Sequence, residues 1–132
     1  MQDRNPTIAI IVDDMFFASK IRAAAEAAGR TVRSIKSREQ LDSELNGSAT
    51  ILVIVDLNSS RLDPFEAIQS IKSITDLASV PVVSFVSHVQ TNLIRRAQEA
   101  GCDYVLPRSV FSQMLPEIVA GRFDKLNTRA TS

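Results

Sequence analysis

The sequence is poor in cysteine, histidine and long apolar stretches. Its single cysteine, Cys102, excludes an intramolecular disulfide and agrees with a reducing compartment. Its single histidine, His88, follows an apolar run and is interpreted as an exposed loop residue rather than a phosphodonor. No apolar stretch approaches the roughly 18 residues of a membrane span, and residues 1–6 lack the apolar core of a signal peptide. We therefore expect a soluble cytoplasmic protein.

The charge of the chain also has no excess of one sign. Fifteen basic residues balance 15 acidic ones, so neither a nucleic acid nor a membrane surface is expected as a partner. A length of 132 residues is enough for one domain with a substantial core. We expect this domain to cover residues 1–120, because residues 121–132 are polar, lack apolar periodicity and are typical of a C-terminal tail.

Two apolar runs in the sequence each end in acidic residues. Residues 8–12 are followed by Asp13 and Asp14, and residues 51–55 are followed by Asp56. Both runs are rich in β-branched residues and apolar on both faces, which predicts central strands of a parallel sheet. If these strands are neighbours, their carboxyl ends bring the three carboxylates into one pocket.

A pocket of three carboxylates needs a cation, a proton or distance, because like charges repel. A hard divalent cation such as Mg²⁺ suits oxygen ligands. The pocket is therefore interpreted as a place where a metal helps an aspartate to accept a phosphoryl group.

The rest of the chain alternates strand-like and helix-like segments five times. The expected strands cover residues 8–12, 31–35, 51–55, 82–86 and 104–106. The expected helices are 16–28, one from the capping box at Ser37 to Asn46-Gly47, one from the cap Asp63, 92–100, and one from near Ser112 with Pro116 in its first turn. This alternation predicts a doubly wound, flavodoxin-like α/β domain with a five-stranded parallel sheet in the order 2-1-3-4-5. Its ligand-binding crevice lies between strands one and three, where the acidic residues fall.

From Thr7 to Val119 the chain resembles the receiver domain of two-component response regulators. The matching segments are Ile-Ile-Val-Asp-Asp at 10–14, Val-Asp-Leu-Asn-Ser-Ser-Arg-Leu-Asp-Pro at 55–64, Val-Pro-Val-Val at 80–83 and Ala-Gly-Cys-Asp-Tyr-Val-Leu-Pro-Arg at 100–108. The resemblance implies that Asp56 is the phospho-acceptor. It also implies that Mg²⁺ is held directly or through water by Asp13, Asp14, Asp56 and the Asn58 carbonyl.

The resemblance further implies partners. A histidine kinase or a phosphotransfer protein would supply the phosphoryl group. These 132 residues contain no output domain, so we expect the signal to leave through a separate effector protein or through self-association into a homodimer. Phe16 and Phe17 are consecutive and cannot share one face, which predicts that one is in the core and the other exposed near the pocket, where it helps a partner to dock.

Three positions depart from the family pattern. Val86 stands where a hydroxyl residue binds the phosphoryl group, and Val105 stands where an aromatic residue switches position. Arg108 replaces the lysine, and its planar guanidinium is not equivalent to a compact ammonium group. We assign Arg108 to the site as its positive charge. We also predict that a response to phosphorylation concentrates at residues 107–115 and leaves residues 86–91 nearly still.

Three functions remain open on this sequence. The first is a phospho-accepting receiver, and the second is a phosphorylation-independent pseudo-receiver that acts as a protein-interaction module, favoured by the three departures. The third is an enzyme or nucleotide binder on the same fold. It is weakened because no glycine-rich loop follows the first strand, and because Asp56-Leu57-Asn58 lacks the second aspartate of an aspartate-based phosphatase. The simpler alternatives are that Asp13 and Asp14 are solvated strand-end and cap residues, and that Arg108 is a surface charge.

Overall fold

The structure is a computed structural model that describes residues 6–45, 49–87, 90–124 and 126. The strands are β1 (Thr7–Ile11), β2 (Thr31–Ser34), β3 (Thr50–Asp56), β4 (Val82–Val86) and β5 (Tyr104–Pro107). The helices are α1 (Met15–Ala27), α2 (Arg38–Leu45), α3 (Pro64–Ser73), α4 (Thr91–Ala100) and α5 (Arg108–Val119), with a short 3-10 helix η1 (Thr75–Leu77). The expected helix end at Asn46-Gly47 and the residue His88 lie outside the described residues.

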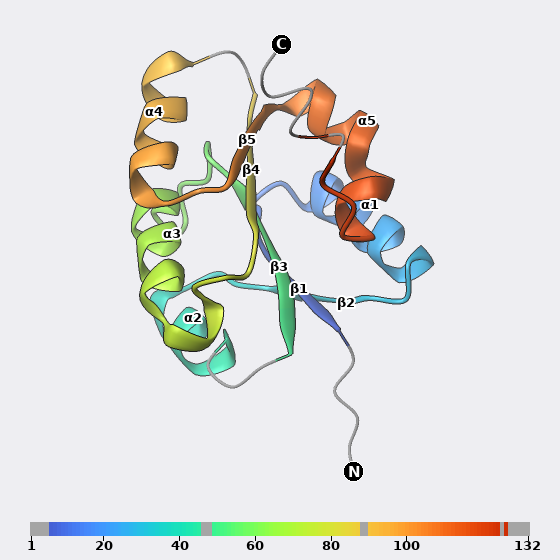
Figure 1. Ribbon diagram of the computed structural model, residues 1–132, viewed down its shortest axis with the longest axis horizontal. Coiled ribbons are helices and arrows are strands. Elements are labelled where there is room, and N and C mark those ends of the chain that lie inside the picture. Colours follow the sequence, from blue (N-terminus) through green and yellow to red (C-terminus); the bar gives the residue numbers. More distant parts are fainter. Residues whose placement is uncertain (1–5, 46–48, 88–89, 125, 127–132) are drawn as a thin grey trace.

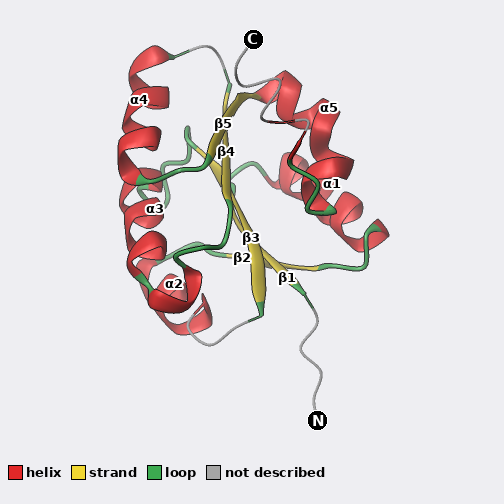
Figure 2. Cartoon of the chain, in the orientation of Figure 1, coloured by secondary structure: helices red, strands yellow, loops and turns green. Residues whose placement is uncertain are grey.

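The five strands form one parallel sheet in the order β2-β1-β3-β4-β5, which confirms the predicted topology. Helices α1 and α5 cover one face of the sheet, and α2, α3 and α4 cover the other (Figures 1 and 2). The direction of winding reverses between β1 and β3, so the crevice at this switch point lies beyond the carboxyl ends of these two strands. None of the described helices has the length and apolar character needed to cross a membrane.

Strand residues alternate between two separate cores. Ile8 and Ile10 of β1 pack on the side of α1 and α5, whereas Ala9 and Ile11 pack on the side of α2, α3 and α4. Both faces are buried, which explains why β1 and β3 read as continuous apolar runs rather than alternating ones. This double burial fixes where each strand ends, and therefore where the acidic residues stand.

Side-chain caps fix the beginnings of three helices. The main-chain N–H groups of Phe65 and Glu66 donate to Asp63 Oδ1 at 2.9 and 3.2 Å, with Pro64 in the first turn, as predicted. At α2 the N–H of Gln40 donates to Ser37 Oγ at 3.1 Å. The return bond of this capping box runs one residue further back than usual, from the N–H of Lys36 to the Gln40 side chain at 2.7 Å.

Helix α5 differs from the sequence prediction. It begins at Arg108 rather than near Ser112, because the chain turns into the helix directly after β5, with Pro107 in extended geometry at its N-cap. Pro116 therefore lies inside the helix and not in its first turn. A proline at this position has no N–H to donate to the carbonyl of Ser112, so α5 carries one hydrogen bond fewer than its length allows.

The chain after Gly121 was expected to be a polar tail, yet two of its described residues pack against the domain. The ring of Phe123 stacks on that of Tyr104, with centroids 5.5 Å apart and an interplanar angle of 17°. Leu126 is completely buried in the core on the side of α1 and α5. The packed part of the chain thus continues past residue 120, because these two apolar residues cover the open side of β5.

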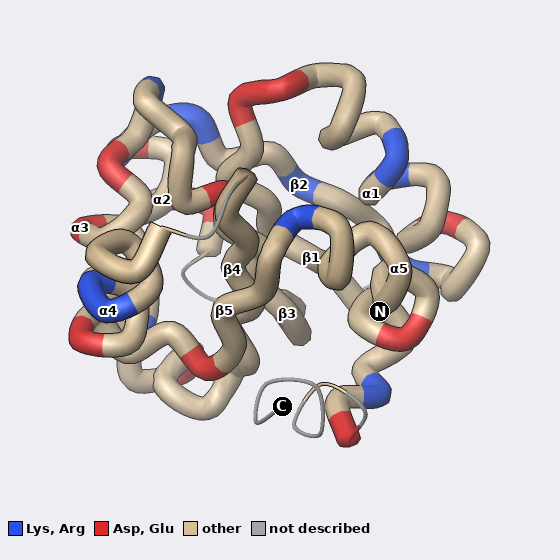
Figure 3. The backbone as a smooth tube through the Cα atoms, turned by 90° about the horizontal axis from the view of Figure 1, so that it is seen from above, with Lys and Arg blue, Asp and Glu red and all other residues tan. Residues whose placement is uncertain are grey.

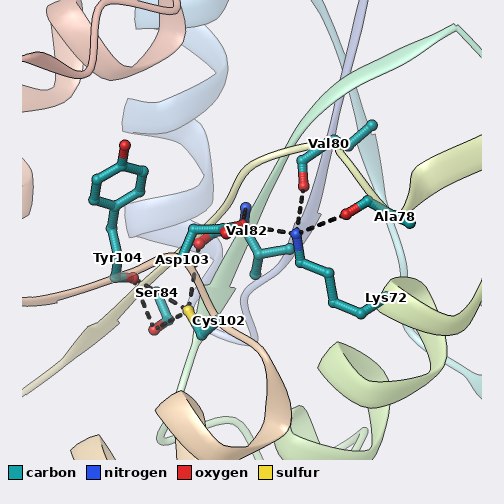
Figure 4. A network of polar contacts seen from close by, with 8 residues as sticks. All are labelled: Lys72, Ala78, Val80, Val82, Ser84, Cys102, Asp103 and Tyr104. Carbon is teal, nitrogen blue, oxygen red and sulfur yellow. Dashed lines mark hydrogen bonds and ion pairs between the residues drawn. The ribbon is translucent and has the colours of Figure 1, made fainter.

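A polar network secures the amino-terminal ends of β4 and β5, opposite the acidic residues (Figure 4). Lys72 Nζ lies 2.8 Å from Asp103 Oδ2 and donates to the carbonyls of Ala78 and Val80. The N–H of Val82 donates to the same Asp103 oxygen. This network positions the amino-terminal end of β4, at the edge of the sheet opposite the acidic residues.

The thiol of Cys102 belongs to the same corner of the sheet and was expected to be small buried filler. Its Sγ lies 3.1 Å from Ser84 Oγ and within hydrogen-bond distance of the carbonyls of Val82 and Tyr104, at 3.3 and 3.2 Å, which compete for its single S–H. Burial raises the pKa of the Cys102 thiol, so the neutral form is favoured at neutral pH. A protonated, hydrogen-bonded thiol fits the predicted structural role.

Candidate functional site

Asp56 occupies the centre of the candidate site. It is the last residue of β3 and only 6% exposed. Its Oδ1 accepts the main-chain N–H of Asn58 at 2.9 Å, which fixes the carboxylate at the start of the following loop. The strand thus delivers a buried carboxylate to the crevice at the switch point, as the sequence predicted.

Asp13 links the end of β1 to the loop that follows β3. Its Oδ2 accepts the N–H groups of Ser60 and Arg61 at 2.8 and 3.2 Å, and the Ser60 hydroxyl lies 3.4 Å away. The carboxylate is exposed on the crevice side of this loop. Sequence reasoning placed Asp13 at the site but missed these contacts, because no local pattern reveals which loop a carboxylate will meet.

Asp14 has a different set of partners. Its Oδ1 caps α1 by accepting the N–H groups of Phe16 and Phe17 at 2.9 and 3.1 Å. Its Oδ2 pairs with Arg108 Nη2 at 3.2 Å. The hydrogen bond from the Phe17 N–H, followed by that from Arg108, lowers the pKa of Asp14. Asp14 therefore caps α1 and pairs with Arg108, while its role as a metal ligand stays a prediction.

Arg108 lies against Asp14 and an aromatic cluster. Its guanidinium carbon is 4.2 Å from the centroid of the Phe17 ring and 6.0 Å from that of Phe85. Together with Phe111, these rings form a buried triad with centroid separations of 5.0, 5.9 and 4.6 Å. No hydrogen bond joins Arg108 to Asp56, although its charge lowers the pKa of Asp56. Arg108 thus acts on Asp56 through its field and not by contact.

Opposing effects set the pKa of Asp56. Burial raises it most, while the Asn58 N–H and the charge of Arg108 lower it. The nearby carboxylates of Asp13 and Asp14 raise it further. The three carboxylates are therefore close enough to repel one another electrostatically. The net effect is that the pKa of Asp56, the most buried of them, is raised.

Comparisons with known proteins agree with this geometry. The chain is 26% identical over 118 residues to the gliding motility regulatory protein of Myxococcus xanthus, a match that covers 89% of this chain but 15% of that protein. It superposes on the phosphorylated cyanobacterial phytochrome response regulator RcpA with a TM-score of 0.71, 20% identity and 97% of each chain covered. A CheY-like receiver domain protein from Methanospirillum hungatei gives a TM-score of 0.74 at 14% identity, covering 95% of this chain and 98% of that one. The chain has the receiver-domain fold.

A third receiver structure, Vibrio cholerae CheY4, gives a TM-score of 0.73 at 14% identity, with 89% and 97% of the two chains covered. No family model matches the sequence. The matched part of the Myxococcus protein is a small fraction of its length, so the likeness concerns one receiver-sized segment. The predicted fold is thereby confirmed, and the roles of the individual site residues are taken up below as proposals.

The crevice offers oxygen atoms of the kind that Mg²⁺ binds. Among the described residues, no group of three or more Asp, Glu, His or Cys side chains is close enough to hold a metal ion. The reason is that Asp14 is turned towards α1 and Arg108. The carboxylates of Asp13 and Asp56 remain, together with the main-chain carbonyl of Asn58, which accepts no hydrogen bond from a described residue. These oxygen donors suit Mg²⁺ chemically, and the Asp14 carboxylate, which is also assigned to the metal site by the sequence, is paired with Arg108 in the structure.

The positions that depart from the receiver pattern are apolar in the structure as well. Val86 ends β4 beside Pro107 and is 1% exposed. Val105 is half-buried against the core on the side of α3 and α4. Tyr104 turns to the other side and stacks on Phe123, so it does not replace the missing switch residue. A polar contact to the segment after β4 comes instead from the side chain of Asn58, a residue that the sequence analysis assigned to the metal site without foreseeing this contact.

Two apolar side chains stand beside the crevice. Met15 and Phe16, in the first turn of α1, are each 81% exposed, whereas Phe17 is buried in the aromatic triad. This division confirms the prediction that only one of the two phenylalanines is in the core. Charged positions of both signs are interspersed around the rest of the molecule (Figure 3).

The raised pKa of Asp56 leads to a first testable prediction. An acid with a raised pKa destabilises the fold in its charged form, so Asp56→Asn is expected to stabilise the metal-free protein at pH 7. An increase of about 1 kcal/mol would raise the melting temperature by roughly 3–5 °C for a domain of this size. The gain should vanish below the ordinary carboxyl pKa of about 3.9, where Asp56 is protonated whether folded or unfolded. Thermal melts of both proteins between pH 3 and pH 8 measure this, and a gain independent of pH would contradict it.

Proposed function

We propose that the chain is a receiver domain that accepts a phosphoryl group on Asp56 and passes the signal on by protein–protein contact. The observation that carries the proposal is the position of Asp56, a buried carboxylate at the switch point of a receiver fold with Asp13 beside it. The donor is a histidine kinase or a phosphotransfer protein, and the recipient of the signal is a separate effector or a second copy of the chain. The free thiol of Cys102 agrees with the reducing cytoplasm as the place of action.

The reaction follows from the residues present. A carboxylate oxygen of Asp56 attacks the phosphorus of a phosphohistidine or a small phosphodonor such as acetyl phosphate. A new O–P bond forms while the bond from phosphorus to the imidazole nitrogen of phosphohistidine, or to the acetyl oxygen of acetyl phosphate, breaks, and the electron pair leaves with the imidazole or with acetate. Mg²⁺, when held by Asp13, Asp56 and the Asn58 carbonyl, would offset the charge on the phosphoryl oxygens. Asp13 holds the loop after β3 in place, and Arg108 contributes positive potential from the other side.

The exposed pair Met15 and Phe16 supports a role in partner binding. The two side chains lie in the first turn of α1, directly after Asp14. Exposed large apolar side chains are uncommon on this surface, where Ile51 is the other one among the described residues. A donor or effector protein that covered them would bury apolar area next to Asp14, at the start of α1.

The proposal is tested by intact mass spectrometry of the protein after incubation with acetyl phosphate and Mg²⁺. We expect the mass to increase by one phosphoryl group per chain and to return to its original value as the acyl phosphate hydrolyses. Phosphohistidine from a purified phosphotransfer protein serves as a second donor. A chain that gains no mass from either donor would contradict phosphoryl acceptance.

That negative result would favour a second function, a phosphorylation-independent interaction module. Three observations support this alternative: Val86 is apolar and buried, Val105 has no ring to move, and Arg108 is already paired with Asp14 and stacked on Phe17. In that case a partner would bind equally well to the wild type and to Asp56→Asn. Pull-down with both proteins distinguishes the two functions, because a phospho-dependent partner would lose affinity for the variant.

Binding of Mg²⁺ is a further expectation of the proposed function. A cation at Asp13 and Asp56 binds the folded state only, so millimolar Mg²⁺ should raise the melting temperature of the wild type by mass action. Asp13→Asn should lose this gain, because one of the two carboxylates disappears. The matched control is Asp63→Asn, which changes a carboxylate that caps α3. Equal gains in all three proteins, or none in the wild type, would argue against the metal site.

A further inference from the structure

The side chain of Asn58 connects the acceptor loop to the segment that follows β4. Its Oδ1 accepts the main-chain N–H of Ser87 at 3.0 Å, and its Nδ2 donates to Gln90 Oε1 at 3.2 Å. The main-chain N–H of Asn58 donates to Asp56 Oδ1 at 2.9 Å. One residue therefore touches the carboxylate on one side and the entry to α4 on the other.

At the start of α4, the partner of Asn58 is Gln90. It is the N-cap residue of α4, yet its side chain makes no capping hydrogen bond to the helix. The first N–H groups of a helix lack partners within the helix and accept a side-chain oxygen of the N-cap residue as their acceptor where one is free. Here the Gln90 oxygen is bound to Asn58 instead, so its contact with the acceptor loop competes with capping of α4.

One other route is a main-chain bond, from the Leu57 N–H to the Phe85 carbonyl at 3.0 Å, which continues the pairing of β3 with β4. The side chain of Val86, where a hydroxyl would stand in the receiver pattern, is apolar and buried and offers no donor. Arg108 is held by Asp14 and Phe17 on the opposite side of the sheet from α4. Among the described residues, the hydrogen bonds from the loop after Asp56 to Ser87 and Gln90 all come from Asn58.

We propose that Asn58 is a positioning residue that couples phosphorylation of Asp56 to the first turn of α4. Its partner is Gln90, whose side chain binds either Asn58 or the start of the helix. The inference rests on the proposed function. Conversion of the Asp56 carboxylate to an acyl phosphate makes its carboxyl group a weaker acceptor for the Asn58 N–H and adds phosphoryl oxygens that attract amide donors. Asn58 Nδ2 then leaves Gln90, and the released Gln90 side chain caps α4. This revises the expectation that a response avoids residues 86–91.

The coupling is tested first in the unmodified protein, by hydrogen exchange of individual amides followed by NMR. Asn58→Ala removes the acceptor of the Ser87 N–H, and a lost hydrogen bond of about 1.4 kcal/mol corresponds to roughly tenfold faster exchange. We expect that acceleration at Ser87 in Asn58→Ala and not in the control Gln98→Ala, an exposed glutamine on α4. Unchanged exchange at Ser87 in Asn58→Ala would overturn the link.

The second measurement uses beryllofluoride with Mg²⁺ as the probe of the acceptor. Fluorine NMR reports whether the probe binds, and amide exchange of residues 91–94 reports the state of α4. We expect slower exchange of these amides on loading in the wild type and in Gln98→Ala, and loss of that response in Gln90→Ala. If the probe does not bind the wild type, phosphoryl acceptance itself is wrong. If it binds and residues 91–94 respond equally in Gln90→Ala, the coupling through Asn58 and Gln90 is wrong.

Discussion

Asp56→Asn is expected to abolish phosphoryl uptake from every donor. The reacting atom is a carboxylate oxygen, and an amide is too weak a nucleophile to replace it. The substitution keeps the size of the side chain and its ability to accept the Asn58 N–H, so the fold should persist and even gain stability. Intact mass and transfer of labelled phosphate from acetyl phosphate measure the loss, which should be complete within detection.

The neighbouring Asp63 provides a matched control for this result. It belongs to the same loop but caps α3, and asparagine caps a helix about as well as aspartate does. Asp63→Asn should therefore accept phosphate like the wild type. Label that remains on Asp56→Asn, or that maps to Ser87 or His88, would show that the acceptor has been assigned to the wrong residue.

A second large effect is expected from the aromatic triad beneath Arg108. Phe111 is completely buried, with its ring centroid 4.6 Å from Phe85 and 5.9 Å from Phe17. Phe111→Ala should lower the free energy of unfolding by about 3–5 kcal/mol, as is usual when a buried phenylalanine leaves a cavity. Urea denaturation at neutral pH measures the change as a lower midpoint with an unchanged slope.

The comparison with Phe16 separates burial from residue type. Phe16 is 81% exposed, so Phe16→Ala removes the same atoms from solvent instead of from the core. Its cost should stay within about 0.5 kcal/mol, the usual range for a surface substitution. Similar losses in the two variants would mean that the triad does not stabilise the domain. Because Arg108 stacks on Phe17, Phe111→Ala should also loosen the pairing of Arg108 with Asp14.

Much of the fold was predictable because the signals are local. The apolar runs before Asp13 and Asp56 and the cap at Asp63 depend on a few adjacent residues, and strand order then follows from the rules of parallel sheets. The start of α5 was not predictable in this way. Pro116 favours the first turn of a helix, but the direct turn from β5 into Arg108 decides the matter.

The partners of the site residues depend on packing between distant segments. The sequence left open whether Arg108 contacts Asp56 or is a surface charge, and in the structure it pairs with Asp14 while its guanidinium stacks on the ring of Phe17. The contact of Asn58 with Ser87 and Gln90 spans about 30 residues and has no sequence signature. Sequence thus identifies which residues surround the crevice, whereas tertiary contacts decide which of them touch.

The order of the strands also has a consequence for folding during synthesis. The central pairs of β1 with β2 and β3 need only residues 7–56, which already contain Asp13, Asp14 and Asp56. Arg108 and α5 emerge about 50 residues later, which at ribosomal rates of 5–20 residues per second is roughly 3–10 seconds. Over that interval Asp13, Asp14 and Asp56 are present without Arg108. On the face of the sheet that α1 and α5 later share, α1 is the only helix yet made. The apolar side chains that later pack against α5 stay uncovered until that helix is synthesised.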